Sequence, residues 1–168
     1  MREIEFRALK DDISNCNFVY GSLFYSNGLP VISDNNSLLI HSCLKNTEGQ
    51  YTGLKDKNGI KIYINDIIDV CVFFVSPENT DYDIHFRGLV IESELKICLK
   101  IYKFLNDSKG WKSITEQGFP FDLDYKEEDN TYIIPLFDLC AISGNLGNIQ
   151  EENLDVVGNI HENPELLN

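Results

Sequence analysis

The chain has 168 residues and is 43% hydrophobic, so it can bury the core of a folded domain and is not expected to be disordered. Its net charge of −13 argues against a protein that coats nucleic acid nonspecifically. Its longest apolar run, 70–75, is far shorter than the roughly 18 residues of a membrane helix, and residues 1–5 lack the apolar region of a signal peptide, so we expect a cytoplasmic protein without a membrane segment.

The first half of the chain reads as a series of short strands separated by turn residues. Charged and apolar residues alternate at the N-terminus, and the dipeptides Asn27-Gly28 and Asn58-Gly59 are typical of tight turns. A nearly continuous apolar stretch follows the second turn and predicts a buried strand. We expect strands at residues 4–8, 18–25, 29–32, 38–44, 60–64 and 67–75.

The second half continues this pattern with one ambiguous segment. Residues 95–105 fit a helix nearly as well as a strand, and we choose a strand because residues 84–91 precede them across a short polar break. Gly88 indicates a bulge, and Pro135 indicates an edge strand. Asn163 followed by a proline predicts a short helical turn. The strands are expected at residues 84–91, 95–105, 111–114, 132–142 and 155–160.

These elements predict a mainly β fold with little helix. We expect a small SH3-like barrel elaborated by N-terminal strands, within a single compact unit. Residues 1–48 would supply the N-terminal strands, 49–160 the barrel core and 161–168 a C-terminal turn. The five cysteines are odd in number and form no CxxC pair, so most should be buried, reduced thiols: Cys16, Cys43, Cys71, Cys98 and Cys140.

Three segments, at residues 1–8, 50–67 and 156–167, resemble the YopX family of bacteriophage and prophage proteins in sequence, order and spacing. The resemblance implies a β-rich fold and a phage or prophage origin, and it carries no established activity. This chain departs from the family pattern at Ile64 and Asn65, where the family usually has an acid and a glycine. It also departs at Leu9, where the family usually has an aromatic residue, and at His161, where it usually has a tyrosine. The residues of the signature turn are Tyr51, Gly53, Leu54, Asp56, Asn58, Gly59, Tyr63 and Asp66.

The sequence predicts no catalytic site and no cofactor. It contains no GxSxG, P-loop, GxGxxG or HExxH motif. Asp81, Asp83 and His85 alternate along a predicted strand, which is a weak pattern for a divalent metal because no fourth ligand is identifiable. The more economical interpretation is a polar strand face, so we predict no metal.

Two surfaces are candidates for binding a macromolecule. Residues 119–168 carry 11 acids and one base, a balance that suits contact with a basic protein partner or serves solubility alone. A basic and aromatic cluster could instead stack on single-stranded nucleic acid. An exposed hairpin face guarded by lysines, with the tryptophan in the core, is the more economical interpretation, because the cluster lacks arginine and the protein is strongly acidic. That cluster is Lys96, Lys100, Tyr102, Lys109, Trp111 and Lys112.

We expect a noncatalytic phage or prophage accessory protein that binds a host or phage protein. The alternative is a single-stranded nucleic-acid-binding module that uses the lysine–tryptophan face. The sequence leaves the partner's identity and homo-oligomerisation open.

Overall fold

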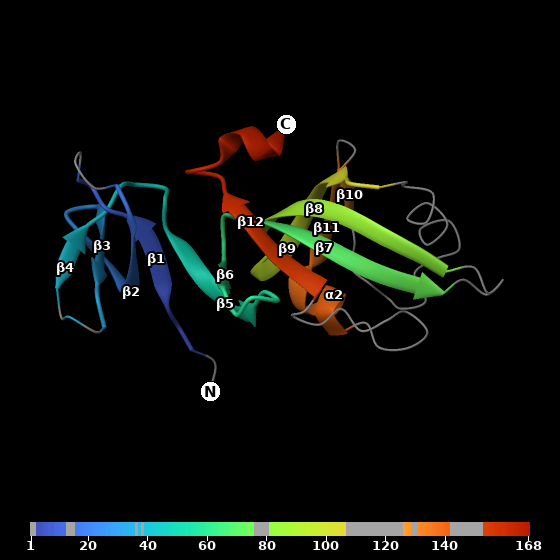
Figure 1. Cartoon of the computed structure of the whole chain (residues 1–168). Helices are drawn as coiled ribbons and strands as arrows, with labels where there is room; N and C mark the ends of the chain where they lie inside the picture. The colour runs from blue at the N-terminus through green and yellow to red at the C-terminus, as the bar shows by residue number, and fades with distance from the viewer. Residues whose placement is uncertain are drawn as a thin grey trace. The chain divides into compact units, whose positions relative to one another are not determined.

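The computed structural model describes residues 3–12, 16–35, 37, 39–75, 81–106, 126–128, 131–141 and 153–168 (Figure 1). Side chains at 73–75, 81–83, 126–128 and 139–141 lie outside this description, as do the predicted strand at 111–114 and Lys109, Trp111 and Lys112 of the basic cluster. The described fold is mainly β, which confirms the predicted class.

The strands run through almost the whole described chain (Figure 1). They are β1 (Phe6–Leu9), β2 (Phe18–Ser26), β3 (Leu29–Ser33), β4 (Ile40–Ser42), β5 (Gly49–Lys55), β6 (Lys61–Tyr63), β7 (Asp66–Val75), β8 (Asp81–Ser93), β9 (Lys96–Phe104), β10 (Lys126–Glu128), β11 (Thr131–Pro135) and β12 (Leu154–Asn159). The helical elements described are α2 (Leu136–Ala141) and the 3-10 helix η2 (Pro164–Leu167).

The chain divides into two compact units. Unit 1 comprises residues 1–54 and 61–65, and unit 2 comprises residues 55–60 and 66–168. The turn between β5 and β6 therefore belongs to unit 2, although the two strands belong almost entirely to unit 1. The expectation of a single compact unit divided at residue 48 stays a prediction.

Unit 1 is built on an antiparallel sheet with the strand order β4-β3-β2-β1-β5-β6. Asn27 and Gly28 both have positive φ, at 53° and 75°, and form the tight turn that the sequence predicts between β2 and β3. One face of the sheet carries the core of buried Ala8, Ile32 and Cys43, against which partly buried hydrophobic residues pack. β1 itself is buried on both sides, because the consecutive residues Arg7, Ala8 and Leu9 are all buried, so the half-buried strand expected from the alternation is more enclosed than predicted.

At one end, the sheet of unit 1 brings β1 back to the segment after β4. An isolated antiparallel bridge joins Lys10 to Cys43, and the Leu44 N–H donates to the Leu9 carbonyl at 2.9 Å. These contacts tie the end of β1 to the segment after β4. Neither sheet of the described chain is closed, so the SH3-like barrel predicted with its core at residues 49–160 is not confirmed.

Unit 2 is built on a second antiparallel sheet with the order β10-β11-β9-β8-β7-β12. The ambiguous segment 95–105 is the strand β9, paired with β8 in the predicted hairpin. The register shifts between Arg87 and Gly88, which confirms the bulge. One face of the sheet supplies the core through its largest fully buried side chains, Ile68, Ile84, Phe86, Leu99 and Ile101.

Two C-terminal predictions need refinement. The apolar segment 132–142 is a strand only as far as Pro135, after which α2 begins. Proline lacks an N–H for a ladder and fixes φ near the helical value, so the strand can end there and a helix can start. Asn163 precedes η2 with a proline in its first turn, as predicted, but its side chain makes no capping hydrogen bond to the helix.

Candidate functional site

The signature turn is organised around the carboxylate of Asp56, which is only 3% exposed. Oδ1 accepts the backbone N–H groups of Asn58 and Ile60, both at 2.8 Å. Oδ2 accepts the Val156 N–H at 3.3 Å and the Asn58 side-chain amide at 3.4 Å. One buried carboxylate thus closes the turn on itself and joins it to β12, 100 residues later.

The protonation of Asp56 follows from these bonds. Burial alone would raise the pKa of this carboxyl, but the hydrogen bonds from three backbone N–H groups and one amide outweigh it and lower the pKa below its ordinary value. The carboxylate therefore stays ionised at neutral pH as a hydrogen-bond acceptor. Its donors saturate it, so it is poorly placed to exchange protons with a substrate.

The remaining turn residues support the same geometry. Gly59 has a φ of 80°, and its N–H donates to the Asp56 carbonyl at 2.9 Å, which confirms the tight turn at Asn58-Gly59. Lys57 adds an ion pair with Asp155 of β12 at 2.6 Å, on the surface. Asn65 has a φ of 76°, so the asparagine that replaces the family's glycine does hold the left-handed conformation.

The other signature residues are dispersed between the units. Tyr51 and Tyr63 are buried side chains of β5 and β6 in unit 1, with ring centroids 5.6 Å apart. Gly53, with a φ of 94°, and the half-buried Leu54 also lie in β5. Asp66 is buried at the start of β7 in unit 2, where it pairs with Asn159 of β12. The signature residues thus belong to both units and make structural contacts within each.

The N-terminal segment of the resemblance packs on β6. The guanidinium carbon of the buried Arg7 lies 4.5 Å from the ring centroid of Phe18 and 4.7 Å from that of Tyr63. The Tyr63 hydroxyl donates to the Glu5 carboxylate, which also pairs with Lys61 at 3.0 Å. Burial, together with Glu5, raises the pKa of Tyr63, so its hydroxyl remains a donor across the physiological range.

The C-terminal segment folds around the buried Asn159. Its Oδ1 accepts the backbone N–H groups of His161 and Glu162 at 3.0 Å, and its Nδ2 donates to the Glu162 carboxylate at 2.6 Å. A Cβ on Gly158 would lie 2.5 Å from Oδ1 of Asn163, which explains the glycine. The signature turn and the C-terminal segment therefore hold backbone in place, whereas the N-terminal segment packs through its side chains.

The lysine–tryptophan face is only partly described. Lys96 is exposed at the start of β9, while Lys100 and Tyr102 are half-buried on the same strand. The Tyr102 hydroxyl donates to the Leu166 carbonyl at 3.1 Å, so this ring packs beneath the C-terminal segment. Burial raises the pKa of Tyr102. The described half of the cluster therefore offers little free aromatic surface for a base to stack on.

The weak metal candidates fall at the start of β8. The side chains of Asp81 and Asp83 lie outside the description, and His85 faces Cys71 of β7, with 3.4 Å between Nε2 and Sγ. Among the described residues, no three histidine, cysteine or carboxylate side chains are grouped as metal ligands. Sequence reasoning missed the Cys71–His85 pair, because only the register of β7 on β8 brings the two residues together.

The part of the chain that the structure describes contains no helix long and apolar enough to cross a membrane. In comparison with known proteins, the family model described as YopX protein matches residues 6–168. No curated protein and no solved structure matches the chain. The match spans nearly the whole chain, including the last three residues of the first segment and all of the other two segments identified in the sequence. This chain therefore belongs to the YopX family.

Proposed function

We propose that this protein is a noncatalytic accessory protein of a phage or prophage, acting in the cytoplasm of the bacterial host by binding a host or phage protein. The observation that carries the proposal is an exposed apolar surface on unit 1, which we call the outer face. It consists of Tyr20, Phe24, Leu29 and Ile40, whose exposed fractions lie between 42% and 67%.

The strand register explains why these side chains share one surface. Phe24 pairs with Val31, Leu29 with Ser26, and Ile40 with Ser33. Cross-strand partners point to the same side, and this side is opposite to the one that carries the core residues Ala8 and Ile32. β2, β3 and β4 contain no lysine, arginine, aspartate or glutamate.

Charge favours a protein over a nucleic acid as the occupant of the outer face. Unit 1 contains six acidic and five basic residues, giving −1, and its Arg7 is buried. A nucleic-acid site needs several accessible cations to contact phosphates. An apolar, nearly neutral sheet face with aromatic side chains instead suits the apolar centre of a protein interface. We therefore assign the outer face to a protein partner with a complementary apolar surface.

The test compares two pairs of apolar substitutions in the full chain. Phe24→Ser/Ile40→Ser changes the outer face, and Leu95→Ser/Leu105→Ser changes exposed residues of unit 2 as a matched control. Each protein is used to capture partners from nuclease-treated host lysate, and the recovered protein is then purified and titrated against each variant. We expect the outer-face variant to bind about tenfold or more weakly and the control to bind as the wild type. Equal binding by both variants would overturn the assignment.

The nucleic-acid alternative makes a separate prediction. Binding of a single-stranded oligonucleotide would weaken steeply with salt, and Lys100→Glu/Lys112→Glu would abolish it. Measurable binding at physiological salt that disappears in this variant would replace the protein-partner proposal.

A further inference from the structure

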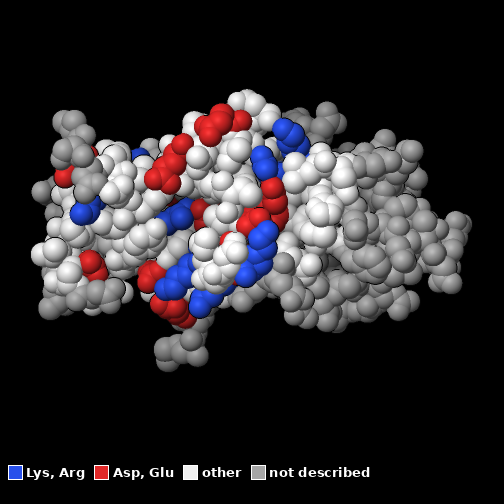
Figure 2. All heavy atoms as spheres, in the orientation of Figure 1, with Lys and Arg blue, Asp and Glu red and all other residues white. Residues whose placement is uncertain are grey.

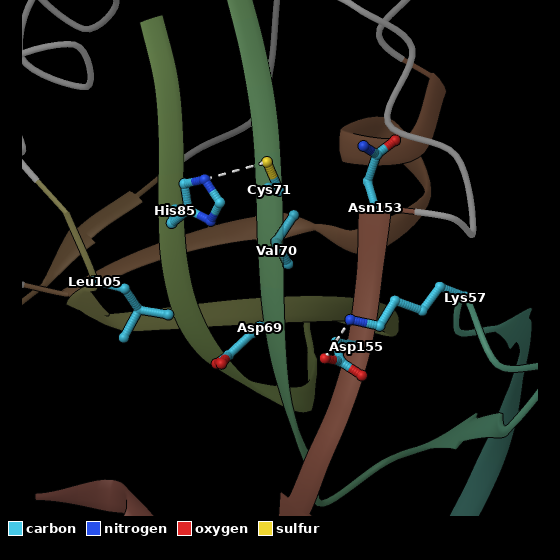
Figure 3. A pocket seen from close by; sticks show the side chains of 8 residues that line it. All are labelled: Lys57, Asp69, Val70, Cys71, His85, Leu105, Asn153 and Asp155. Carbon is cyan, nitrogen blue, oxygen red and sulfur yellow. Dashed lines mark hydrogen bonds and ion pairs between the residues drawn. The ribbon is translucent and has the colours of Figure 1, made fainter.

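A small cavity opens on unit 2, on the side of the sheet that carries polar side chains (Figure 3). Its volume is about 240 Å³, below the ~300–1,000 Å³ typical of sites for whole metabolites. β7, β8, β12 and the signature turn supply most of its walls, with Cys71, His85, Asn153 and Lys57 among the lining residues. This cavity has room for a small substituent on one of its side chains.

Cys71 and His85 meet in this cavity because the sheet fixes them as neighbours. They are direct cross-strand partners in the β7–β8 register, and Nε2 of the imidazole lies 3.4 Å from the sulfur. Figure 3 shows the two side chains turned toward each other. Two residues along the same strands, Arg87 binds Asp69 through two bonds of 2.6 and 2.8 Å, which holds this side of the hairpin in register.

The other described thiols lack this combination of access and a basic neighbour. Cys43 and Cys98 are buried, and burial raises the pKa of both thiols. Cys16 is exposed, with its Sγ 3.7 Å from the Lys10 carbonyl oxygen. Cys71 is half-buried, lines a cavity and lies within hydrogen-bonding reach of an imidazole. Reactive cysteines have this kind of partly accessible setting beside a group that takes the thiol proton.

We infer that Cys71 is a covalent modification site that exchanges with small disulfides, with His85 as the proton acceptor. The Cys71 thiol gives its proton to His85 Nε2, and the thiolate sulfur attacks one sulfur of a low-molecular-weight disulfide. The sulfur–sulfur bond of the disulfide breaks as the Cys71 mixed disulfide forms. The other half leaves as a thiolate and takes up a proton, so no further oxidant or reductant is required.

The size of the cavity limits which disulfides can react with Cys71. A volume of about 240 Å³ accommodates the thiol half that remains on the protein. Asn153, Lys57 and Asp155 lie on the far wall and offer hydrogen-bonding groups to a polar thiol half (Figure 3). The site therefore fits a small polar disulfide better than a bulky apolar one.

The experiment measures labelling of each cysteine in the intact folded protein. Dilute bis(2-hydroxyethyl) disulfide, a small polar disulfide, is added at pH 7, the reaction is quenched with acid over a time course, and each modified cysteine is quantified by peptide mass spectrometry. We expect Cys71 to be modified at least about tenfold faster than Cys16, the exposed thiol in the same sample. A Cys71 rate equal to or below that of Cys16 overturns the proposal, and this comparison needs no variant.

Two variants test the role of His85. His85→Gln should slow modification of Cys71 by about tenfold or more, while the Cys16 rate in the same sample stays unchanged. Lys103→Gln, an exposed neighbour in β9 opposite Arg87, serves as the matched control and should leave the Cys71 rate unchanged. A Cys71 rate that is unaffected by His85→Gln, in a variant with wild-type melting temperature, would remove His85 from the reaction and overturn the assignment.

Discussion

The two units differ sharply in charge and in what they expose. Unit 1 has a net charge of −1 and presents the apolar outer face, whereas unit 2 has 21 acidic and nine basic residues, giving −12. In the described part of unit 2, polar groups instead join distant segments, as Asp56 joins the turn to β12. On the side drawn in Figure 2, its described acidic and basic side chains are interspersed.

This difference separates what identifies the family from what we propose for function. The signature residues lie where backbone must be held, such as the Asp56 turn and the Asn159 segment. The proposed outer face lies on β2, β3 and β4, outside the three segments that carry the resemblance. A motif can thus be specific for a family because the fold needs it, without marking the surface that binds a partner.

The largest effect is expected from a single methyl group in unit 1. A Cβ on Gly49 would lie 2.3 Å from the backbone carbonyl oxygen of Ile64, so Gly49→Ala must move backbone and should cost about 3 kcal/mol of unfolding free energy. Gly158→Ala in unit 2 should cost less, because its nearest neighbour is the Asn163 side chain, which can rotate.

Hydrogen exchange would locate the Gly49→Ala effect. We expect protection to fall in β1, β2 and β5 while β7 and β8 keep theirs. An equal loss in both units would show that they unfold together, in agreement with the single unit expected from the sequence.

The next largest effect is expected at the signature turn. Asp56→Ala leaves three backbone N–H groups of unit 2 without their acceptor and should cost about 2 kcal/mol or more, measured by denaturant unfolding. Asp155→Ala, which removes a surface ion pair with Lys57 and a long exposed hydrogen bond of 3.5 Å from the Asn58 amide, is the control and should have little effect. Comparable losses in the two variants would contradict the central role of Asp56.

The same carboxylate predicts a pH dependence. The pKa of Asp56 is lower in the folded than in the unfolded chain, so the ionised carboxylate adds to the free energy of unfolding. This stabilisation is fully present well above the ordinary pKa of 3.8 and is lost as the pH falls below 3.8 toward the pKa of the folded state. Unfolding measured between pH 6 and pH 3 should therefore show a shallower acid limb in Asp56→Asn than in the wild type. Parallel acid limbs would show that this carboxyl has the same pKa in both states.

The smallest effect in this series is expected from Gly59→Val. No atom lies within 4 Å of an added Cβ, so the cost is that of a β-branched residue at a φ of 80°, about 1 kcal/mol or more. Gly59→Asn should recover most of this loss, because asparagine tolerates positive φ. An unchanged melting temperature in Gly59→Val would show that the turn relaxes to another conformation.

The sequence by itself determined the secondary structure of most of the described chain. Period-two alternation predicted β1, and the Asn27-Gly28 and Asn58-Gly59 dipeptides predicted two turns that the structure confirms, because these signals depend on residues close in sequence. The resemblance also identified the family, since three segments matched in order and spacing. The proposed roles of the acidic surface and of the lysine–tryptophan face stay predictions.

Only the tertiary structure decided which distant residues meet. The bond from Val156 to Asp56 and the pairing of Cys71 with His85 depend on strand register, which a sequence pattern does not specify for residues so far apart. The same holds for the open sheets in place of a barrel, because closure depends on how strongly each sheet curls. The sequence could not predict the outer face for a related reason. Tyr20 and Phe24 are residue types that usually lie in a core, and only the structure shows that the opposite face of the sheet is buried while these two side chains are exposed.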